Sequence, residues 1–505
     1  MNLKQKYWFL SLLLTFGLWL GLTPPSYAAQ SPSSPEAKVV HVLNRLSFGP
    51  RPGDIETVKS KGIEAYIQSQ LSPDSIAQSQ TVTQQLASLP TLRMSPVEII
   101  REYQQQQNRV NKKIQQTSPE MVMAANQQNA EIRMARRQVL EEATQGRLVR
   151  AIASSRQLEE VLVDFWYNHF NVFFGKGRAR FLVGTYEEQA IRPHVLGKFR
   201  SLVGATAKHP AMLFYLDNWQ NTAPDSRGAR GRYKGLNENY ARELMELHTL
   251  GVNGGYTQQD VITLARILTG WGFPGRRQRA NDGSGFYFDA TRHDFSDKVF
   301  LGQTIKGSGM AEGEQALDIL ARHPATARHI SYKLAQYFVA DEPPTSLVDQ
   351  LTKRFQETDG DIKTVLNTLF SSSEFLDPKY YNAKFKTPYQ YLVSALRATD
   401  TQVENYRTAA GVLRQMGMPV YGCPTPDGYK NTEEAWLNPD AILRRISLTT
   451  ALVSGRFSEK SSVTAEQLAT TLGNNFSPKT MQVIAANPEG MKAALILGSP
   501  EFMRR

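Results

Sequence analysis

Apolar side chains recur at spacings of three and four residues along most of the chain, which is the spacing of one face of an α-helix. The first such segment after the N-terminal region is KVVHVLNRL (38–46), and the pattern is strongest between 147 and 174. Further segments of helical spacing cover 184–193, 197–208, 237–250, 257–270, 313–322, 324–339, 345–357, 360–371, 386–399, 405–416, 440–455, 464–472, 478–485 and 489–497. The pattern predicts a mainly α, large multi-helical fold.

One stretch departs from helical spacing. Residues 285–304 (GFYFDATRHDFSDKVFLGQT) alternate between apolar and polar positions and are rich in aromatic and turn-forming residues. Such alternation is typical of short strands joined by a turn. We therefore expect one short β-hairpin near 284–304.

The N-terminal residues have the layout of a cleavable secretory signal. Lys4 and Lys6 precede an apolar run over 7–22, and small residues follow around Ala28. A run this short favours a cleaved leader over a membrane anchor, which needs about 20 apolar residues. We expect a signal peptide over 1–28 with cleavage after Ala28, export to the periplasm or beyond the cell, and no transmembrane segment in the mature chain.

The remainder is expected to form one unit. Residues 29–36 are a flexible lead-in rich in Ser and Pro, and 37–505 is predicted to be a single large helical domain. Within it, 95–146 contains clusters of Gln and Asn and few strongly apolar residues. This composition indicates an insertion of one or two long, exposed helices.

Composition is that of a globular protein. Of the 505 residues, 41% are hydrophobic and 21% are charged, which excludes a collagen-like or wholly disordered chain. Cys423 is the single cysteine, so the chain has no intrachain disulfide, and a catalytic thiol in this Pro/Gly-rich loop is disfavoured. The fold is therefore expected to depend on burial of apolar side chains.

The helix predicted over 237–250 carries the densest set of chemically capable side chains. At 100° per residue, one polar face is formed by Glu238, Asn239, Arg242, Glu243 and Glu246. His248 points in another direction, so it cannot chelate a metal ion together with Glu246, and an HExxH motif is absent. This polar face either forms ordinary ion pairs on the surface of an exposed helix or lines a functional site.

A second helix, predicted over 159–175, carries a narrow polar stripe on an otherwise apolar surface. The stripe consists of Glu160, Asp164, Asn168 and Asn171, at spacings of four, four and three. A helix this apolar is expected to be buried nearly all round, with His169 on its apolar side as an interior histidine. The stripe must then face a partner, ordered water or a cavity, because unpaired buried polar groups are costly.

We interpret the two polar faces as the walls of one cleft. Asp164, Glu243 and Glu246 would supply acid/base chemistry, since carboxyl groups in a half-buried site can separate in pKa. The side chains expected to bind substrate are Asn239, Arg242, Trp271, Asn168 and Asn171. Trp271 either stacks on a sugar ring or fills the core.

Other candidates give weaker signals. His293 and Asp294, in the predicted hairpin, are adjacent and could bind a metal ion. The Gly/Arg-rich loops 222–236 and 273–285 are either solvated or contact an anionic envelope polysaccharide, consistent with the net charge of +11. No nucleic-acid-binding signature is present. No motif indicates a cofactor, since the sequence lacks a Walker A motif, a Rossmann glycine fingerprint, a GxSxG motif and a clustered Cys/His pattern.

Several blocks of the sequence resemble one known family. DFWYNHF (164–170), NENYAREL (237–244), RHDFSDKVFLG (292–302) and PTPDGY (424–429) follow one another as in the exported bacterial family called "domain of unknown function 1800". The resemblance covers about residue 37 to the C-terminus and implies a mostly helical secreted protein, with no established reaction. The 95–146 stretch looks longer than usual in that family, and Cys423 stands where proline is commoner.

These observations leave three functional expectations. The first is an exported hydrolase or lyase that acts on an extracellular or envelope polymer by carboxylate acid/base chemistry. The second is a non-enzymatic surface or envelope protein that binds a glycan or another partner. The third is a metal-dependent enzyme that uses His293 and Asp294.

Overall fold

The computed structural model describes residues 35–102, 137–231, 233–274, 283–455, 457 and 463–505. The predicted signal peptide, nearly all of the lead-in and most of the 95–146 insertion lie outside these residues. The described ends of the insertion, 96–102 and 137–146, are helical, and the second helical run continues to 153. Within the described part of the chain, no helix combines the length and the apolar composition that a bilayer crossing requires.

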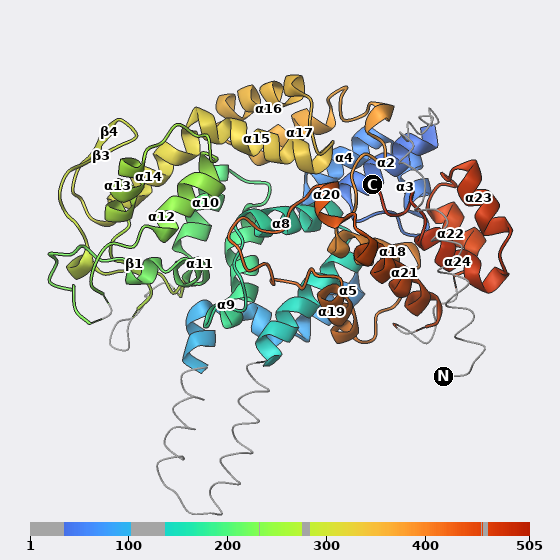
Figure 1. Cartoon of the computed structure of the whole chain (residues 1–505), viewed down its shortest axis with the longest axis horizontal. Helices are drawn as coiled ribbons and strands as arrows, with labels where there is room; N and C mark the ends of the chain where they lie inside the picture. The colour runs from blue at the N-terminus through green and yellow to red at the C-terminus, as the bar shows by residue number, and fades with distance from the viewer. Residues whose placement is uncertain (1–34, 103–136, 232, 275–282, 456, 458–462) are drawn as a thin grey trace, which may run out of the picture.

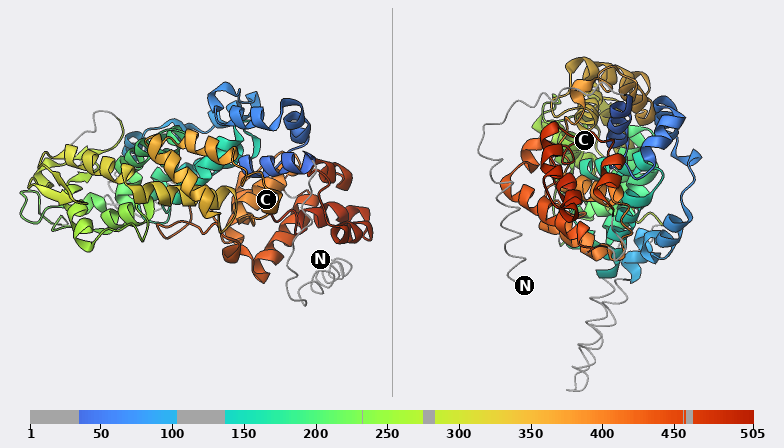
Figure 2. Two further views of the ribbon diagram at one scale, coloured as in Figure 1. Left: turned by 90° about the horizontal axis from the view of Figure 1, so that it is seen from above. Right: turned by 90° about the vertical axis from the view of Figure 1, so that its right-hand side faces the viewer.

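The described chain is mainly α-helical, as predicted, and Figure 2 shows an elongated body. The N-terminal part contains α2 (Pro35–Leu46), α3 (Asp54–Lys61), α4 (Ile63–Gln70) and α5 (Gln80–Ala87). The next part contains α8 (Gln157–His169), α9 (Ala179–Tyr186), α10 (Phe199–Lys208), α11 (Pro210–Tyr215), α12 (Asn239–Glu243) and α13 (Gln258–Ile267). In Figure 1, α10 to α13 lie at one end of the body.

The second half of the chain returns along the body to its other end. A long helical layer is formed by α14 (Met310–Arg322), α15 (Pro324–Phe338), α16 (Thr345–Glu357) and α17 (Ile362–Phe370), and Figure 1 shows it along the top. The C-terminal helices are α18 (Pro388–Ala398), α19 (Tyr406–Gln415), α20 (Glu433–Trp436), α21 (Pro439–Val453), α22 (Ala465–Thr471), α23 (Pro478–Ala485) and α24 (Glu489–Leu497). Figure 1 places α22 to α24 close to α2 and α3.

Within the described residues, two small antiparallel sheets complete the fold. Strand β1 (Trp271–Gly272) pairs with β2 (Tyr287–Phe288), and β3 (Lys298–Phe300) pairs with β4 (Gln303–Ile305). The β3–β4 pair is the hairpin that alternation predicted, although it occupies only the last third of the 284–304 segment. The β1–β2 pairing joins residues 15 or more positions apart, which local pattern does not reveal.

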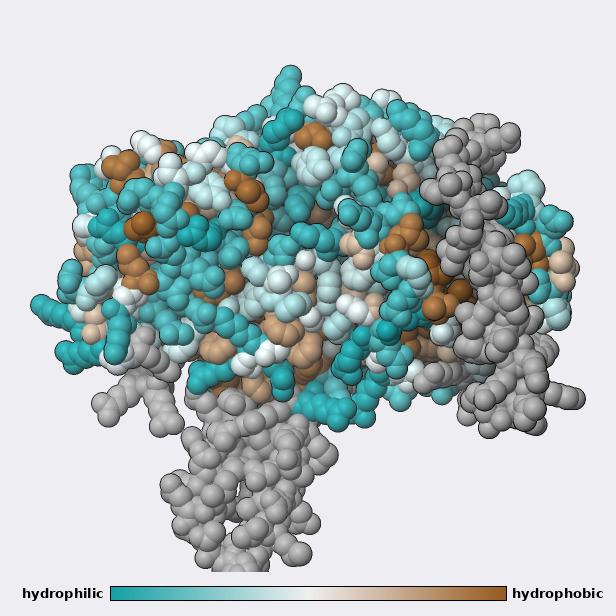
Figure 3. Space-filling view, viewed as in Figure 1, coloured by the Kyte–Doolittle hydropathy of each residue, from teal (hydrophilic) through white to brown (hydrophobic). Residues whose placement is uncertain are grey.

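The core is continuous from α2 to the C-terminal residues, and α8 runs through it. Trp166 is fully buried, and its indole nitrogen donates to the carbonyl of Val195 at 3.2 Å. As its apolar composition predicts, α8 is buried nearly all round. On the outside, Figure 3 shows hydrophilic side chains over most of the viewed face, with apolar ones in small groups.

The helix predicted over 237–250 is regular only at its start. The α-helical part, α12, ends at Glu243, and a π-helix, η6 (Leu244–Thr249), follows. The wider turn is stabilised by the Thr249 hydroxyl, which donates to the carbonyl of Leu244 at 2.6 Å, and by the Leu250 amide, which donates to Met245 at 2.8 Å. Single π-helical turns are rare and occur frequently at functional sites.

Candidate functional site

A loop far along the chain is bound to the polar stripe of α8. We call residues 418–430, which lie between α19 and α20, the strap; Figure 1 shows it crossing in front of α8. Asn168 Nδ2 donates to the carbonyl of Tyr429, and Asn168 Oδ1 accepts from the Tyr429 amide, both at 2.8 Å. Asn171 Nδ2 donates to the carbonyls of Cys423 and Thr425 at 3.0 and 2.8 Å. Asn168 and Asn171 were predicted to bind substrate, but their amides bind the chain's own backbone instead.

The strap approaches α8 so closely that its sequence is constrained. Gly428 has φ of +71°, and a Cβ there would lie 2.2 Å from the carbonyl oxygen of Asn168. Only glycine avoids both the backbone strain and this clash. Tyr421 also has a positive φ, 56°. Its carbonyl accepts a hydrogen bond of 3.0 Å from the Phe174 amide.

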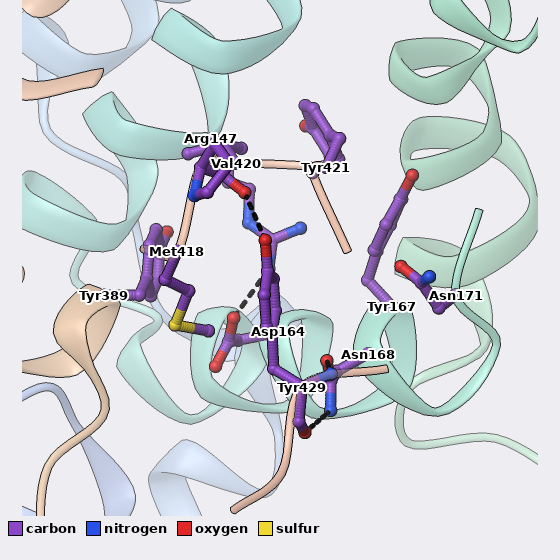
Figure 4. A pocket seen from close by; sticks show the side chains of 12 residues that line it. Arg147, Asp164, Tyr167, Asn168, Asn171, Tyr389, Met418, Val420, Tyr421 and Tyr429 are labelled. Carbon is purple, nitrogen blue, oxygen red and sulfur yellow. Dashed lines mark hydrogen bonds and ion pairs between the residues drawn. The ribbon is translucent and has the colours of Figure 1, made fainter. Parts of the chain in front are cut away.

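A small pocket lies where the strap meets α8, with an empty volume of about 350 Å³ that is partly open to solvent. Its walls are Arg147, Asp164, Tyr167, Asn168, Asn171, Tyr389, Met418, Pro419, Val420, Tyr421, Gly422 and Tyr429. Figure 4 shows Arg147 and Asp164 joined across the pocket, with the ring of Tyr429 beside them. The pocket therefore contains Asp164, Asn168 and Asn171 but neither Glu243 nor Glu246.

Arg147 neutralises the acidic groups of this pocket. Its Nη2 pairs with Asp164 Oδ1 at 2.6 Å and its Nη1 with Glu187 Oε2 at 2.9 Å. The Tyr421 hydroxyl donates to the same Glu187 oxygen at 3.0 Å. Burial raises the pKa of Asp164, and the adjacent guanidinium opposes that rise. Asp164 is thus a buried, paired carboxylate, and its partner is an arginine instead of a second catalytic carboxyl group.

The remaining acid of the α8 stripe is paired in the same way. Arg192 Nη1 contacts Glu160 Oε1 at 2.8 Å, and its Nη2 contacts Glu187 Oε1 at 3.3 Å. Glu187 therefore bridges Arg147 and Arg192 from η3 (Glu187–Ile191), which is also π-helical. Every member of the stripe finds a protein partner, which satisfies the requirement that buried polar groups be paired.

A second acidic group lies where α12 passes into η6. We call Glu243, Glu246 and Asp427 the acidic face; the first two are half-buried neighbours on the helix, and the third comes from the strap. Glu243 accepts no hydrogen bond from the described residues, and burial together with Glu246 and Asp427 raises its pKa, against the effect of Arg242. The Tyr256 hydroxyl donates to Glu246 Oε2 at 3.3 Å.

The strap connects the pocket and the acidic face. Its backbone is held by α8, while its Asp427 acts electrostatically on Glu243. The Tyr215 hydroxyl fixes the strap near the acidic face by donating to the carbonyl of Pro424 at 2.9 Å. The strap is thus hydrogen-bonded to α8 and acts electrostatically on Glu243, whereas Asp164 pairs with Arg147 in the pocket.

Two predicted substrate-binding residues lie beside the acidic face. Arg242 is partly exposed and contacts Glu238 Oε2 at 3.1 Å and Gln258 Oε1 at 2.9 Å. Asn239 is exposed, and its Nδ2 donates to the carbonyl of Leu216 at 3.2 Å. Both residues are accessible to a ligand approaching Glu243.

Trp271 is a core residue. It is fully buried, and its ring lies so close to Gly313 that a Cβ there would be 2.1 Å from the indole. Its ring also packs edge-on against Phe286, with centroids 5.1 Å apart. The prediction that it could stack on a sugar is therefore wrong, since no face of the ring reaches solvent.

His293 and Asp294 are fully engaged with protein partners. His293 Nδ1 lies 2.8 Å from the carbonyl of Thr269, and its Nε2 lies 2.9 Å from Glu312 Oε1. Asp294 pairs with Arg266 at 2.8 Å, and hydrogen bonds from Ser296 contribute to lowering its pKa to about 2 against the effect of burial. Both ring nitrogens of His293 therefore have protein partners, and neither is free to bind the metal ion that the sequence suggested.

Other histidines are also interior groups. His248 and His169 are buried, and desolvation lowers the pKa of both, that of His248 to about 3. His169 Nε2 donates to the carbonyl of His248 at 3.1 Å. In the part of the chain that the structure describes, no group of three His, Cys, Asp or Glu side chains is arranged to hold a metal ion.

Sequence reasoning missed two residues that define these sites. A buried Asp164 requires a cation, so a basic partner was to be expected. The sequence does not show which helix packs against α8, and therefore does not identify that partner as Arg147. Asp427 acts on Glu243 from the strap, about 180 residues further along the chain. No local spacing signals such proximity.

Comparison with known proteins identifies a family without a function. Residues 41–504 match the family described as "Protein of unknown function (DUF1800)". No curated protein and no solved structure gives a significant match. The geometry of the acidic face is therefore the main guide to what the molecule does.

Proposed function

The chain belongs to this family of unknown function, and on that premise we propose that it is a hydrolase or lyase that acts on an extracellular or envelope polymer by carboxylate acid/base chemistry. The observation that carries the proposal is the unequal pair formed by Glu243 and Glu246. Asp164, which the sequence suggested as a third catalytic group, is given no chemical role because Arg147 neutralises it.

The two carboxyl groups differ in their surroundings. Glu243 is half-buried, lacks a hydrogen-bond donor among the described residues and faces the negative charge of Glu246 and Asp427, which favours its protonated form. Glu246 accepts a hydrogen bond from the Tyr256 hydroxyl at 3.3 Å. Neighbouring carboxyl groups in unlike surroundings are suited to act as acid and base.

This asymmetry assigns the roles. Glu243 would donate a proton to the leaving oxygen of the bond that breaks, and Glu246 would accept a proton from water or from the substrate. Arg242 and Asn239 are placed to orient the substrate beside Glu243. A partly exposed face suits a long chain lying across it better than a small molecule that needs enclosure.

The proposal is tested by supplying the purified mature chain with polysaccharides and peptidoglycan and measuring new reducing ends or unsaturated products. Glu243→Gln and Glu246→Gln should each lower the rate by about 100-fold or more, the usual contribution of a general acid or base. Glu56→Gln, on an exposed surface of α3, is the matched control and should leave the rate unchanged.

Two results would overturn the proposal. One is full activity in both amide variants. The other is tight binding of a polymer that the wild-type chain never cleaves, which would establish the non-enzymatic glycan-binding alternative.

A further inference from the structure

A further pocket lies where α2 meets the C-terminal residues, at the opposite end of the body from α12 (Figure 1). Its empty volume is about 360 Å³, and it is partly open to solvent. Asn44 of α2, Lys386 just before α18 and Phe502 after α24 are among the residues that line it. The lining contains no member of the acidic face, so a role for this pocket goes beyond the proposed function.

Lys386 is buried in the wall of this pocket. The residue is 3% exposed, and its Nζ donates to the Ser394 hydroxyl at 2.8 Å. The ammonium also lies 4.0 Å from the centroid of the Phe502 ring. Among the described residues, no carboxylate lies at ion-pair distance from it. The ammonium is thus held by a hydroxyl and an aromatic ring, without a negative charge.

The other buried lysines of the chain have acidic partners. Within the described residues, three lysines are buried, namely Lys298, Lys384 and Lys386. Lys298 contacts Glu312 Oε2 at 2.6 Å, and Lys384 pairs with Asp341. An ammonium in the interior is costly unless an anion compensates it. A bound anion would therefore explain why Lys386 departs from the other two.

A second buried cation lies beside Lys386. Arg445 is fully buried, and its Nη2 donates to the Lys386 carbonyl at 2.6 Å. Its Nε and Nη1 have no hydrogen-bond partner among the described residues. Burial, and then the charges of Arg445 and Arg505, lower the pKa of Lys386. A negative group bound to the Lys386 ammonium would oppose this effect.

Asn44 offers a second polar group to the same pocket. It is 9% exposed, and its side-chain amide has no hydrogen-bond partner in the described part of the chain. Its Oδ1 and the Ser394 Oγ that holds Lys386 lie around one glycine, because a Cβ on Gly49 would be 3.6 Å and 2.7 Å from them. Asn44 and Lys386 therefore each keep a donor that no described residue uses.

We propose that this pocket binds a small organic monocarboxylate, with its carboxylate group on Lys386 and Asn44. The two oxygens of a carboxylate can accept from an ammonium and from an amide N–H at the same time. A short carbon body would contact the apolar part of the lining, which a halide ion would leave unused. This apolar part consists of Val40, Leu472, Phe476 and Phe502.

One negative charge suits the pocket better than two. Glu501 also lines it and accepts from the Ser477 amide and the Thr480 hydroxyl, both at 3.0 Å. Arg504, the other cation of the lining, is compensated by Glu433, whose Oε2 lies 3.0 Å from Arg504 Nη1. A dianion such as phosphate would gain one uncompensated ammonium but would be repelled by Glu501.

The test compares propionate with propionamide, which has nearly the same shape but no charge. Isothermal titration calorimetry on the purified chain measures both affinities. We expect propionate to bind about tenfold or more tightly, because hydrogen bonds to charged groups are stronger than those between neutral groups. Lys386→Met should abolish this preference, and Asn44→Ala should weaken propionate binding several-fold. Chloride and phosphate, titrated in the same way, should bind more weakly than propionate.

Controls separate a lost contact from a lost fold. Lys353→Met makes the same exchange at a lysine whose side chain is 79% exposed on α16, and it should leave propionate binding unchanged. Cooperative thermal unfolding of Lys386→Met reports an intact fold, since methionine fills the space of the buried aliphatic chain. If that variant does not fold, Asn44→Ala and the comparison of acid with amide decide the question.

The inference is overturned if propionate and propionamide bind equally, or if neither binds, which would leave solvent as the partner of Lys386. It is also overturned if Lys386→Met keeps the full preference, if Asn44→Ala binds propionate as the parent does, or if chloride or phosphate binds more tightly. Cleavage of a polymer enters none of these measurements, so a failure of the proposed function gives a separate result.

Discussion

Asn168 and Tyr429, 261 positions apart in the chain, hold each other through two reciprocal hydrogen bonds of 2.8 Å each. The side-chain amide of Asn168 replaces the backbone partner that Tyr429 would have in a sheet. Because both groups of the Tyr429 backbone depend on one side chain, this pair fixes the strap to α8 near the C-terminal end of the strap.

Asn168→Ala should destabilise the protein by about 1–3 kcal/mol, because the amide and carbonyl of Tyr429 lose their partner in a half-buried place. Urea unfolding followed by circular dichroism measures the change. Gln356→Ala, at an exposed position of α16, is the control and should change stability by less than about 0.5 kcal/mol. Equal effects in the two variants would show that the strap does not depend on Asn168.

Gly428→Ala should destabilise more than Gly417→Ala, although both glycines have a positive φ, +71° and +82°. Gly417 has open space around its missing Cβ, so alanine there costs only the backbone strain, about 1–2 kcal/mol. At Gly428 the Cβ would also meet the Asn168 carbonyl oxygen. The difference in melting temperature between the variants measures this steric part, and a difference of zero would contradict the close approach.

Arg147→Met should cost about 3–5 kcal/mol, because Asp164 and Glu187 would be left as buried charges without their cation. The matched control is Arg328→Met, which breaks an ion pair with Asp349 whose side chains are more than half exposed. That change should cost about 0–1 kcal/mol. Chemical unfolding of both variants gives the comparison, and a loss under 1 kcal/mol for Arg147→Met would argue against a paired network.

His209→Asn should flatten the loss of stability in acid. Burial lowers the pKa of His209 from 6.5 to about 3, so between these values the unfolded chain binds a proton that the folded chain does not. Stability from this group is complete above pH 6.5 and falls as the pH is lowered, by at most about 1.4 kcal/mol per pH unit. Asparagine keeps the helix cap, since His209 Nδ1 accepts the Ala211 amide at 3.1 Å.

The chain contains a matched control for this experiment. His323 caps α15 in the same His-Pro-Ala sequence, but it is only partly buried. His323→Asn should therefore change the pH dependence of the melting temperature less than His209→Asn. The opposite order would show that burial does not govern the titration of these histidines.

Glu243→Gln should stabilise the protein at about pH 8 and leave its stability unchanged below about pH 4. The pKa of Glu243 is raised in the folded state, so the folded chain holds a proton that the unfolded chain has released. Stability from this group therefore falls as the pH rises through that interval. Melting temperatures of wild type and variant across the pH range check the sign, and a destabilised amide variant at pH 8 would contradict it.

The local pattern of the sequence determined the elements of this fold. The apolar spacing of residues 157–169 predicts the buried helix α8, and the alternation before Thr304 predicts the β3–β4 hairpin, because both depend on which side of a regular element each side chain occupies. The stripe of Glu160, Asp164, Asn168 and Asn171 likewise required partners wherever the helix was buried.

Tertiary structure alone decided what those partners are. Arg147 reached Asp164, and the strap reached Asn168, through packing between segments that local spacing does not relate. The π-helical turn after Glu243 and the approach of Asp427 to Glu243 arise in the same way. The physical reason is that a polar group in the interior needs an opposite charge or a hydrogen bond, but many residues can supply it, and only the folded chain selects which one does.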